Sequence, residues 1–145
     1  MTLAIITMDS VPPKGASNKF NQTQHTTTVL IVDDNEDNLL LLSYALDELG
    51  YSIIQGSCGE EAIELAAQCR PDLILLDILL PDMNGTTVIR HLRHQRGLKN
   101  IPIIAVTALA RPVEKSKIIA AGFTAYLSKP YMLDELQALV THYAG

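Results

Sequence analysis

The sequence lacks any apolar run long enough to span a membrane, and residues 1–8 lack the basic start of a signal peptide. It contains only two cysteines, Cys58 and Cys69, which have neither CxxC spacing nor enough partners for a metal site. We interpret both as small buried side chains in a reducing compartment. Acidic residues outnumber basic ones by 16 to 11, and the net charge of −5 disfavours general affinity for nucleic acids or anionic membranes. These absences favour a cytoplasmic protein without nucleic-acid binding or membrane insertion.

Aromatic residues are also few, at 5%, whereas hydrophobic residues make up 48% of the 145 positions. A chain of this size builds one domain with a core of Leu, Ile, Val and Ala, and it leaves no room for a second domain. Residues 1–27 differ from the rest, because after a short apolar start they are polar and show no helical or strand period. We therefore predict a flexible tail over residues 1–27 and a folded domain over residues 28–145. A docking peptide at residues 3–6 is the alternative interpretation of the tail.

From Thr28 onward, short apolar runs alternate with segments of helical period. The predicted strands are residues 29–32, 52–56, 73–77, 103–106 and 125–127; the predicted helices are residues 36–49, 57–70, 86–96, 112–121 and a last one through 133–140. Leu49 is expected on the buried face of the first helix, and Ser57 with Glu60 resembles a capping box at the start of the second. Five strand–helix units in succession predict an α/β fold with a doubly wound parallel sheet and helices on both faces.

Polar side chains follow four of the five predicted strands. They are Asp33 and Asp34 after the first strand, Asp77 at the end of the third, Thr107 after the fourth and Lys129 after the fifth. Because the carboxyl ends of parallel strands share one edge of the sheet, these groups are expected to converge there. Three clustered carboxylates repel one another, and a divalent cation offsets that repulsion. Taken singly, the two adjacent aspartates are as typical of a helix cap, the lysine of a solvated surface and the threonine of an ordinary strand-end hydroxyl.

Four motifs occur in a fixed order: Val29-Leu-Ile-Val-Asp-Asp-Asn, Leu75-Leu-Asp-Ile-Leu-Leu-Pro-Asp-Met-Asn-Gly, Ala105-Val-Thr-Ala and Leu127-Ser-Lys-Pro. Together, over residues 28–143, they resemble the receiver domain of two-component response regulators, such as the single-domain chemotaxis regulators. The resemblance implies a flavodoxin-like fold with five helices and five parallel strands in the order 2-1-3-4-5. It also implies a signalling protein rather than an enzyme, one that catalyses only its own aspartyl phosphorylation and dephosphorylation. Because no output domain follows the four motifs, we expect a stand-alone receiver.

The same resemblance implies roles for the carboxylates. Asp77 is expected to accept a phosphoryl group from a phosphohistidine of a histidine kinase or a histidine phosphotransfer protein. Asp33, Asp34 and Asp77 are expected to hold Mg²⁺, together with the backbone carbonyl of Leu79. The carboxylates would then have a chemical reason to lie so close to one another.

Further roles implied by the resemblance concern the last two strands. Thr107 is expected to hydrogen-bond the phosphoryl group, Lys129 to pair with it, and the Lys129–Pro130 peptide bond to be cis. In the family the threonine moves towards the phosphoryl group and an aromatic residue turns inward, and Tyr126 occupies that aromatic position here. Phosphorylation would change the surface of the fourth helix, fifth strand and fifth helix, which signals to a downstream protein; the alternative is a phosphoryl relay.

Four leucines are expected to affect phosphate lifetime or partner docking. Leu79 and Leu109 lie two residues beyond the acceptor and the threonine, where receivers that lose phosphate quickly often have polar side chains that orient water. We therefore expect slow self-hydrolysis. Leu40 or Leu41 is expected outside the apolar stripe of the first helix, where it would dock a helical partner bearing the donor histidine; an ordinary exposed leucine is the alternative interpretation.

Two other function classes stay open. An aspartate-dependent phosphotransferase or phosphatase enzyme would need an acid two residues after its nucleophile, where Leu79 stands. A flavin-binding module of the same topology would need a Ser/Thr/Gly-rich loop after the first strand, where acids stand.

His91 and His94 lie three residues apart on a predicted helix, but their neighbours are basic, so we interpret them as part of a solvated face. Asn84-Gly85 is interpreted as turn chemistry.

Overall fold

The computed structural model describes residues 26–108 and 111–144, which form five strand–helix units. The elements are β1 Thr28–Val32, α1 Glu36–Asp47, β2 Ser52–Gly56, α2 Gly59–Cys69, β3 Leu73–Asp77, α3 Gly85–His94, β4 Ile103–Thr107, α4 Pro112–Ala121, β5 Ala125–Ser128 and α5 Leu133–Ala144. All strand pairs are parallel, and the order in the sheet is β2-β1-β3-β4-β5. The predicted doubly wound fold and its strand order are confirmed. The predicted tail lies almost entirely outside the described residues and stays a prediction.

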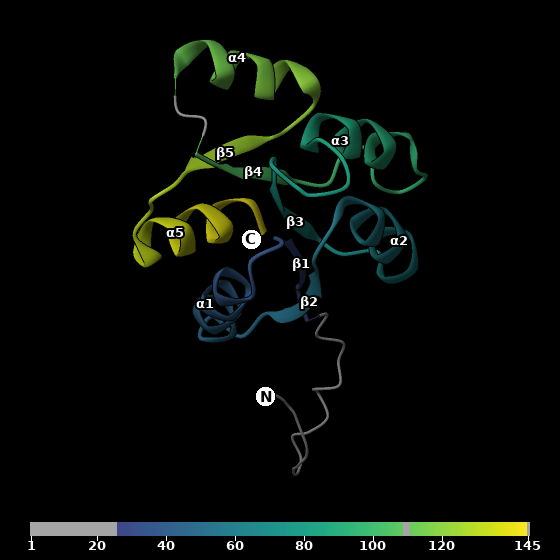
Figure 1. Ribbon diagram of the computed structural model, residues 1–145. Helices are drawn as coiled ribbons and strands as arrows, with labels where there is room; N and C mark the ends of the chain where they lie inside the picture. The colour runs from purple at the N-terminus through teal and green to yellow at the C-terminus, as the bar shows by residue number, and fades with distance from the viewer. Residues whose placement is uncertain (1–25, 109–110, 145) are drawn as a thin grey trace.

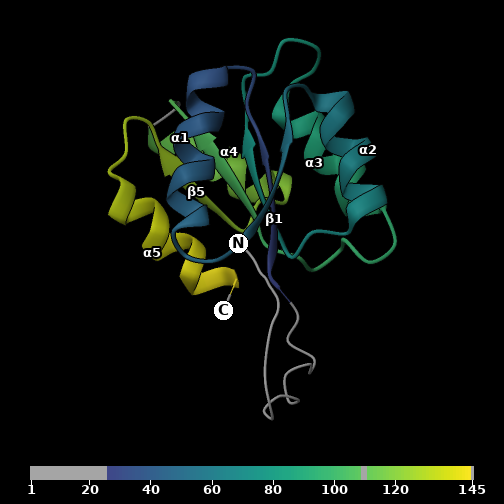
Figure 2. The ribbon, with the colours of Figure 1, turned by 90° about the horizontal axis from the view of Figure 1, so that it is seen from below.

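Helices cover both faces of the sheet (Figures 1 and 2), and an apolar layer lies between the sheet and the helices on each face. One layer joins β-strand side chains to the inner faces of α2, α3 and α4, and the other joins the opposite side chains of the strands to α1 and α5. The central strands β3 and β4 are buried along their whole length, because helices cover both of their faces. No helix in residues 26–108 or 111–144 is long and apolar enough to cross a membrane.

Helix α1 is shorter than predicted. It ends at Asp47, and Leu49 is 40% exposed, so its predicted place on the buried face is wrong. The chain turns after the helix, and Gly50 takes a positive φ of 85° there, a conformation that glycine adopts at little steric cost. Leu40 and Leu41, 70% and 45% exposed, lie outside the buried stripe as predicted.

Helix α2 and the residues before it correct two predictions, one on its cap and one on the two cysteines. The residue before the helix is Cys58, and Ser57 bonds through its N–H and hydroxyl to Glu61 rather than to Glu60, so the predicted capping box is wrong. The free N–H groups of the first turn are instead capped by a carboxylate from the β3–α3 loop, which sequence neighbours cannot reveal. Cys58 is only half-buried and Cys69, on the last turn of α2, is exposed, so neither is the core side chain we predicted.

Candidate functional site

The sheet register brings the predicted polar side chains to one edge. Val32 pairs with Leu76 at the ends of β1 and β3, so Asp33 and Asp77 follow side by side. Both carboxylates are buried, with exposed fractions of 2% and 6%, and Thr107 at the end of β4 is fully buried. They are the only buried polar or charged side chains of the described residues. Buried carboxylates are costly unless cations or hydrogen-bond donors compensate them, so this edge holds a set of compensating partners.

Lys129 lies between the two buried carboxylates. Its Nζ is 3.3 Å from Oδ2 of Asp77 and 3.4 Å from Oδ2 of Asp33. Its backbone N–H donates to the carbonyl of Thr107 at 2.8 Å, which fixes the start of the β5–α5 loop against β4. The peptide bond between Lys129 and Pro130 is cis. The lysine is therefore a partner of the carboxylates and not a freely solvated side chain.

Backbone and amide donors hold three of the four oxygens of these two carboxylates. Oδ1 of Asp33 accepts the N–H of Asn35 at 2.9 Å, and Oδ2 accepts a side-chain N–H of Asn38 at 3.2 Å. Oδ1 of Asp77 accepts the N–H of Leu79 at 3.1 Å. Asn35 is the cap of α1, because its side chain accepts the N–H of Asn38, so the helix-cap interpretation of the two adjacent aspartates is wrong. Sequence reasoning missed both asparagines; the place of one directly before the first helical turn was a usable signal.

The pKa shifts of Asp77 and Lys129 indicate that the charge of the lysine does not fully offset the cost of burying the two carboxylates. Burial raises the pKa of Asp77, and the charge of Asp33 adds to the rise, although the Leu79 N–H and Lys129 oppose it. Burial alone would lower the pKa of Lys129, but the charges of Asp77 and Asp33 outweigh it and raise that pKa. The ammonium is therefore charged, while Asp77 still ionises less readily than a solvated aspartate. A further cation would favour the ionised form of Asp77.

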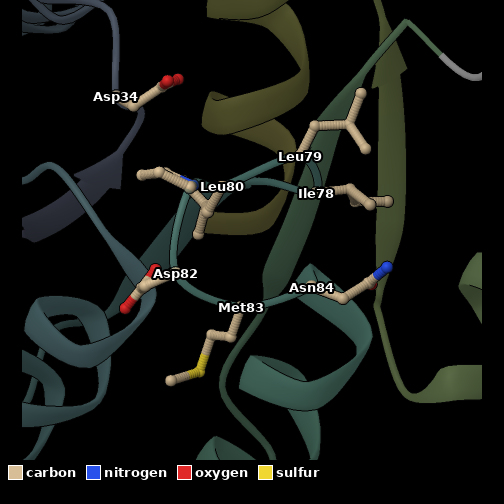
Figure 3. A pocket seen from close by; sticks show the side chains of 8 residues that line it. Asp34, Ile78, Leu79, Leu80, Asp82, Met83 and Asn84 are labelled. Atoms are coloured by element: carbon tan, nitrogen blue, oxygen red, sulfur yellow. The ribbon is translucent and has the colours of Figure 1, made fainter.

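The donor set fits a hard divalent cation. One carboxylate oxygen from each of Asp33, Asp34 and Asp77 can be chosen so that all three lie within 4.8 Å of one another. Oxygen ligands of this kind suit Mg²⁺, which binds few carboxylates and keeps several waters. Asp34 is exposed, so solvent reaches the group from its side. Asp34 also lines a hollow of about 370 Å³ with the β3–α3 loop, residues 78–84 (Figure 3).

The other predicted residues are placed as follows. The side chain of Leu79 is 56% exposed and lines the same hollow, whereas Leu109 lies outside the described residues. Tyr126 is half-buried on β5, with Lys115 Nζ 5.0 Å from its ring centre. His94 bonds through Nδ1 to the carbonyl of Arg90 at 2.7 Å, within its own helix.

The loop after β3 leads into α3 at Asn84 and Gly85, which are the cap and the first residue of that helix, so the turn interpretation of Asn84-Gly85 is wrong. Asn84 caps α3, since its side chain accepts the backbone N–H and the hydroxyl of Thr86. Asp82, which sequence reasoning missed, caps α2 from the same loop. No signal along the chain pointed to that contact, because its partners are more than twenty residues away.

Comparisons with known proteins point to one family. Residues 29–141 match the response regulator receiver domain. The polar-differentiation response regulator DivK of Brucella ovis is 39% identical over 120 residues, covering 83% of this chain and 98% of DivK. The chemotaxis response regulator CheY4 of Vibrio cholerae has a similar structure, with a TM-score of 0.79 and 29% identity over 82% of this chain and 99% of that one. The receiver domain of a sensor histidine kinase from Pseudomonas aeruginosa has a TM-score of 0.77 and 33% identity, covers 83% and 99% of the two chains, and has magnesium in its active site cleft.

Proposed function

The chain belongs to the response regulator receiver family, which makes it a phosphoryl-accepting signalling protein, and from that premise we propose that Asp77 is the acceptor. The donor is a phosphohistidine on a histidine kinase or a histidine phosphotransfer protein in the cytoplasm. The observation that carries the assignment is the position of Asp77, a buried carboxylate at the end of the central strand with a lysine 3.3 Å away. The enzyme and flavin-binding alternatives are not favoured.

The transfer is a displacement at phosphorus. A carboxylate oxygen of Asp77 forms the new P–O bond as the P–N bond to the donor imidazole breaks, and the imidazole keeps the bonding electron pair. Of the two oxygens, Oδ1 is held by the Leu79 N–H and Oδ2 faces Lys129. The ammonium reduces the charge that develops on the phosphoryl oxygens, and the buried Thr107 lies at the adjacent strand end.

Mg²⁺ would be held by Asp33, Asp34 and Asp77, with the backbone carbonyl of Leu79 as a further ligand. When bound, it would neutralise phosphoryl charge that one lysine cannot neutralise alone. The chain's own contribution is to fix the carboxylates. Amide donors hold both oxygens of Asp33, and its Oδ2 also faces Lys129. Prearranged carboxylates bind a cation without having to reorganise.

The experiment is phosphorylation of the purified protein with acetyl phosphate and Mg²⁺, followed by detection of acid-labile, hydroxylamine-sensitive phosphate. Wild type should be labelled and Asp77→Asn should not, because the amide is nearly isosteric but has no nucleophilic carboxylate. A labelled Asp77→Asn protein would refute the acceptor assignment. Tightly bound flavin in the purified protein would favour the binding-module alternative instead.

We propose further that phosphorylation changes the surface of α4, β5 and α5 through Thr107 and Tyr126. Tyr126 pairs with Ala105 in the sheet register, two residues before Thr107, and packs partly against the α2–α4 core layer. Movement of the threonine towards the phosphoryl group would open space for the ring, a two-state repacking. The test is NMR of Tyr126 with beryllofluoride and Mg²⁺; an unchanged ring environment would exclude this switch.

A further inference from the structure

The loop between β3 and α3 is closed at its base. The N–H of Gly85 donates to the carbonyl of Ile78 at 2.8 Å, and Leu79 and Asn84 form an isolated antiparallel bridge. The two sides approach so closely that a Cβ atom on Gly85 would lie 2.7 Å from the Cα of Ile78. Loop residues 79–84 are thereby closed into one unit, and Leu79 belongs to the base of that unit.

A bidentate contact holds the far side of this loop. Oδ1 of Asp82 accepts the N–H of Gly59 at 2.7 Å, and Oδ2 accepts the N–H of Glu60 at 2.9 Å. These N–H groups belong to the first turn of α2, where a carboxylate is also favoured by the helix dipole. The two hydrogen bonds lower the pKa of Asp82, so the carboxylate is ionised at neutral pH. In Figure 3 its oxygens point away from Leu79, towards α2.

The next residue adds a packing contact between the same two segments. Met83 lies against Gly59, and a Cβ atom on that glycine would collide with the Cγ of Met83. Met83 also packs against the apolar layer under α2 and α3. Polar and apolar contacts from two successive loop residues therefore fasten the loop to the start of α2.

We propose that Asp82 is a positioning residue for the metal and acceptor site: it anchors the loop to α2 and thereby fixes the backbone of Leu79 against Asp77. The Leu79 N–H is 3.1 Å from Oδ1 of Asp77, and the proposed carbonyl ligand belongs to the same residue. Without the anchor, the loop would sample positions in which this N–H and this carbonyl are misplaced. The inference rests on the proposed function of the Asp77 site.

The primary test is the Kd for Mg²⁺, measured by titration calorimetry of the full chain. Asp82→Ala should weaken Mg²⁺ binding about 10-fold, the scale seen when a group that orients a metal ligand is removed. Asp82→Asn, which keeps one acceptor oxygen, should show a smaller loss. Gly59→Ala would displace Met83 while the Asp82 side chain is kept, and it should also weaken Mg²⁺ binding. It therefore tests the anchor independently if Asp82→Ala does not fold.

The matched control is Glu61→Ala. Oε1 of Glu61 accepts the N–H and the hydroxyl of Ser57 at 2.7 and 2.9 Å, so its hydrogen bonds hold the start of α2 and not the loop, although its charge also acts on Asp82. Its removal should leave Mg²⁺ affinity unchanged. Equal losses in Glu61→Ala and Asp82→Ala would mean that the stability of α2 alone matters, and they would overturn the proposal.

A second readout separates positioning from general damage. The rate of labelling by acetyl phosphate should fall in Asp82→Ala at low Mg²⁺ and recover at saturating Mg²⁺, because the lost property is metal affinity. Mg²⁺ affinity equal to that of wild type, or a labelling defect that saturating Mg²⁺ does not repair, would overturn the role of Asp82 while leaving Asp77 as the acceptor. Wild type that neither binds Mg²⁺ nor becomes labelled would instead overturn the proposed function, and this inference with it.

Discussion

The charged side chains at the two ends of the sheet differ in how fully they are paired. At the amino end, charged side chains satisfy backbone groups: Asp72 accepts the N–H of Thr28 at 2.8 Å, and the guanidinium of Arg93 donates to loop carbonyls. At the carboxyl end, Asp33 and Asp77 are buried facing each other and share one lysine. The first arrangement compensates polar groups that folding would otherwise leave unpaired, whereas the second leaves negative charge in excess.

This difference separates residues that hold the fold from residues that we propose to carry the chemistry. Arg93 reaches the carbonyls of Leu98, Lys99, Ile101 and Gly122, which lie in the loops before β4 and β5. A complete set of partners of this kind stabilises one conformation. An incomplete set, as around Asp77, leaves capacity for a cation or a phosphoryl group. Substitutions at the two ends should therefore affect different measurements.

The largest effect is expected at the amino end. Arg93→Met should lower the free energy of unfolding by about 2–4 kcal/mol, because it leaves several carbonyls without a donor. Denaturant unfolding measures this, with the exposed Arg90→Met on the same helix as the control. Under conditions in which the variant is folded, its rate of labelling by acetyl phosphate should equal that of wild type. A slower rate would show that the two ends of the sheet are coupled.

The next largest effect concerns phosphate lifetime at the carboxyl end. Leu79→Asn together with Leu109→Glu should speed loss of the phosphoryl group by roughly 10 to 100-fold, since orienting the attacking water is worth about 1.4 to 3 kcal/mol. The lifetime of the labelled protein in Mg²⁺ is the measurement, and Leu79→Val is the apolar control. A wild-type half-life of seconds, or no acceleration in the double variant, would show that water access is controlled elsewhere.

A smaller effect is expected for the exposed leucines that lie on α1, which begins at the carboxyl end. Leu40→Glu with Leu41→Glu should slow transfer from the partner kinase roughly fivefold, about 1 kcal/mol, because an apolar contact with the helical donor is lost. Transfer from acetyl phosphate should be unchanged. Leu49→Glu, an exposed leucine beyond the other end of α1, is the matched control. Equal slowing with both donors would mean damage to the site rather than to docking.

The smallest effect is a pH dependence of stability without Mg²⁺. Burial raises the pKa of Asp77, so between its ordinary value of 3.8 and the raised folded value the native state binds more protons than the unfolded state. The charged carboxylate therefore destabilises the fold above the folded pKa, and this cost disappears as the pH falls below 3.8. Asp77→Asn should accordingly be more stable than wild type at neutral pH, with an advantage that shrinks on acidification. The measurement is the difference in Tm between Asp77→Asn and wild type in EDTA at several pH values. A difference that does not shrink on acidification would show that burial of the charge imposes no cost.

The succession of strands and helices along the chain and the residues at the strand ends could be predicted from the sequence, because both depend on short-range patterns. The order of the strands in the sheet was implied by the family resemblance. Apolar runs such as Leu73–Leu76 predict buried strands, and parallel strands place their carboxyl ends at one edge whatever the details of packing. The predictions that depended on packing were less successful. Leu49 fits the helical period of α1, yet the helix ends two residues earlier, and the capping glutamate of Ser57 is Glu61 rather than Glu60.

The sequence by itself thus determined the strands, their succession along the chain and the polar side chains that follow them. Only the tertiary structure decided which distant donors hold a carboxylate: the α2 amides of Gly59 and Glu60 hold that of Asp82. The physical reason is the range of the interactions. Strand and helix patterns repeat within a few residues, whereas Asp82 and Gly59 are 23 residues apart and meet only because β3 carries its loop to the start of α2.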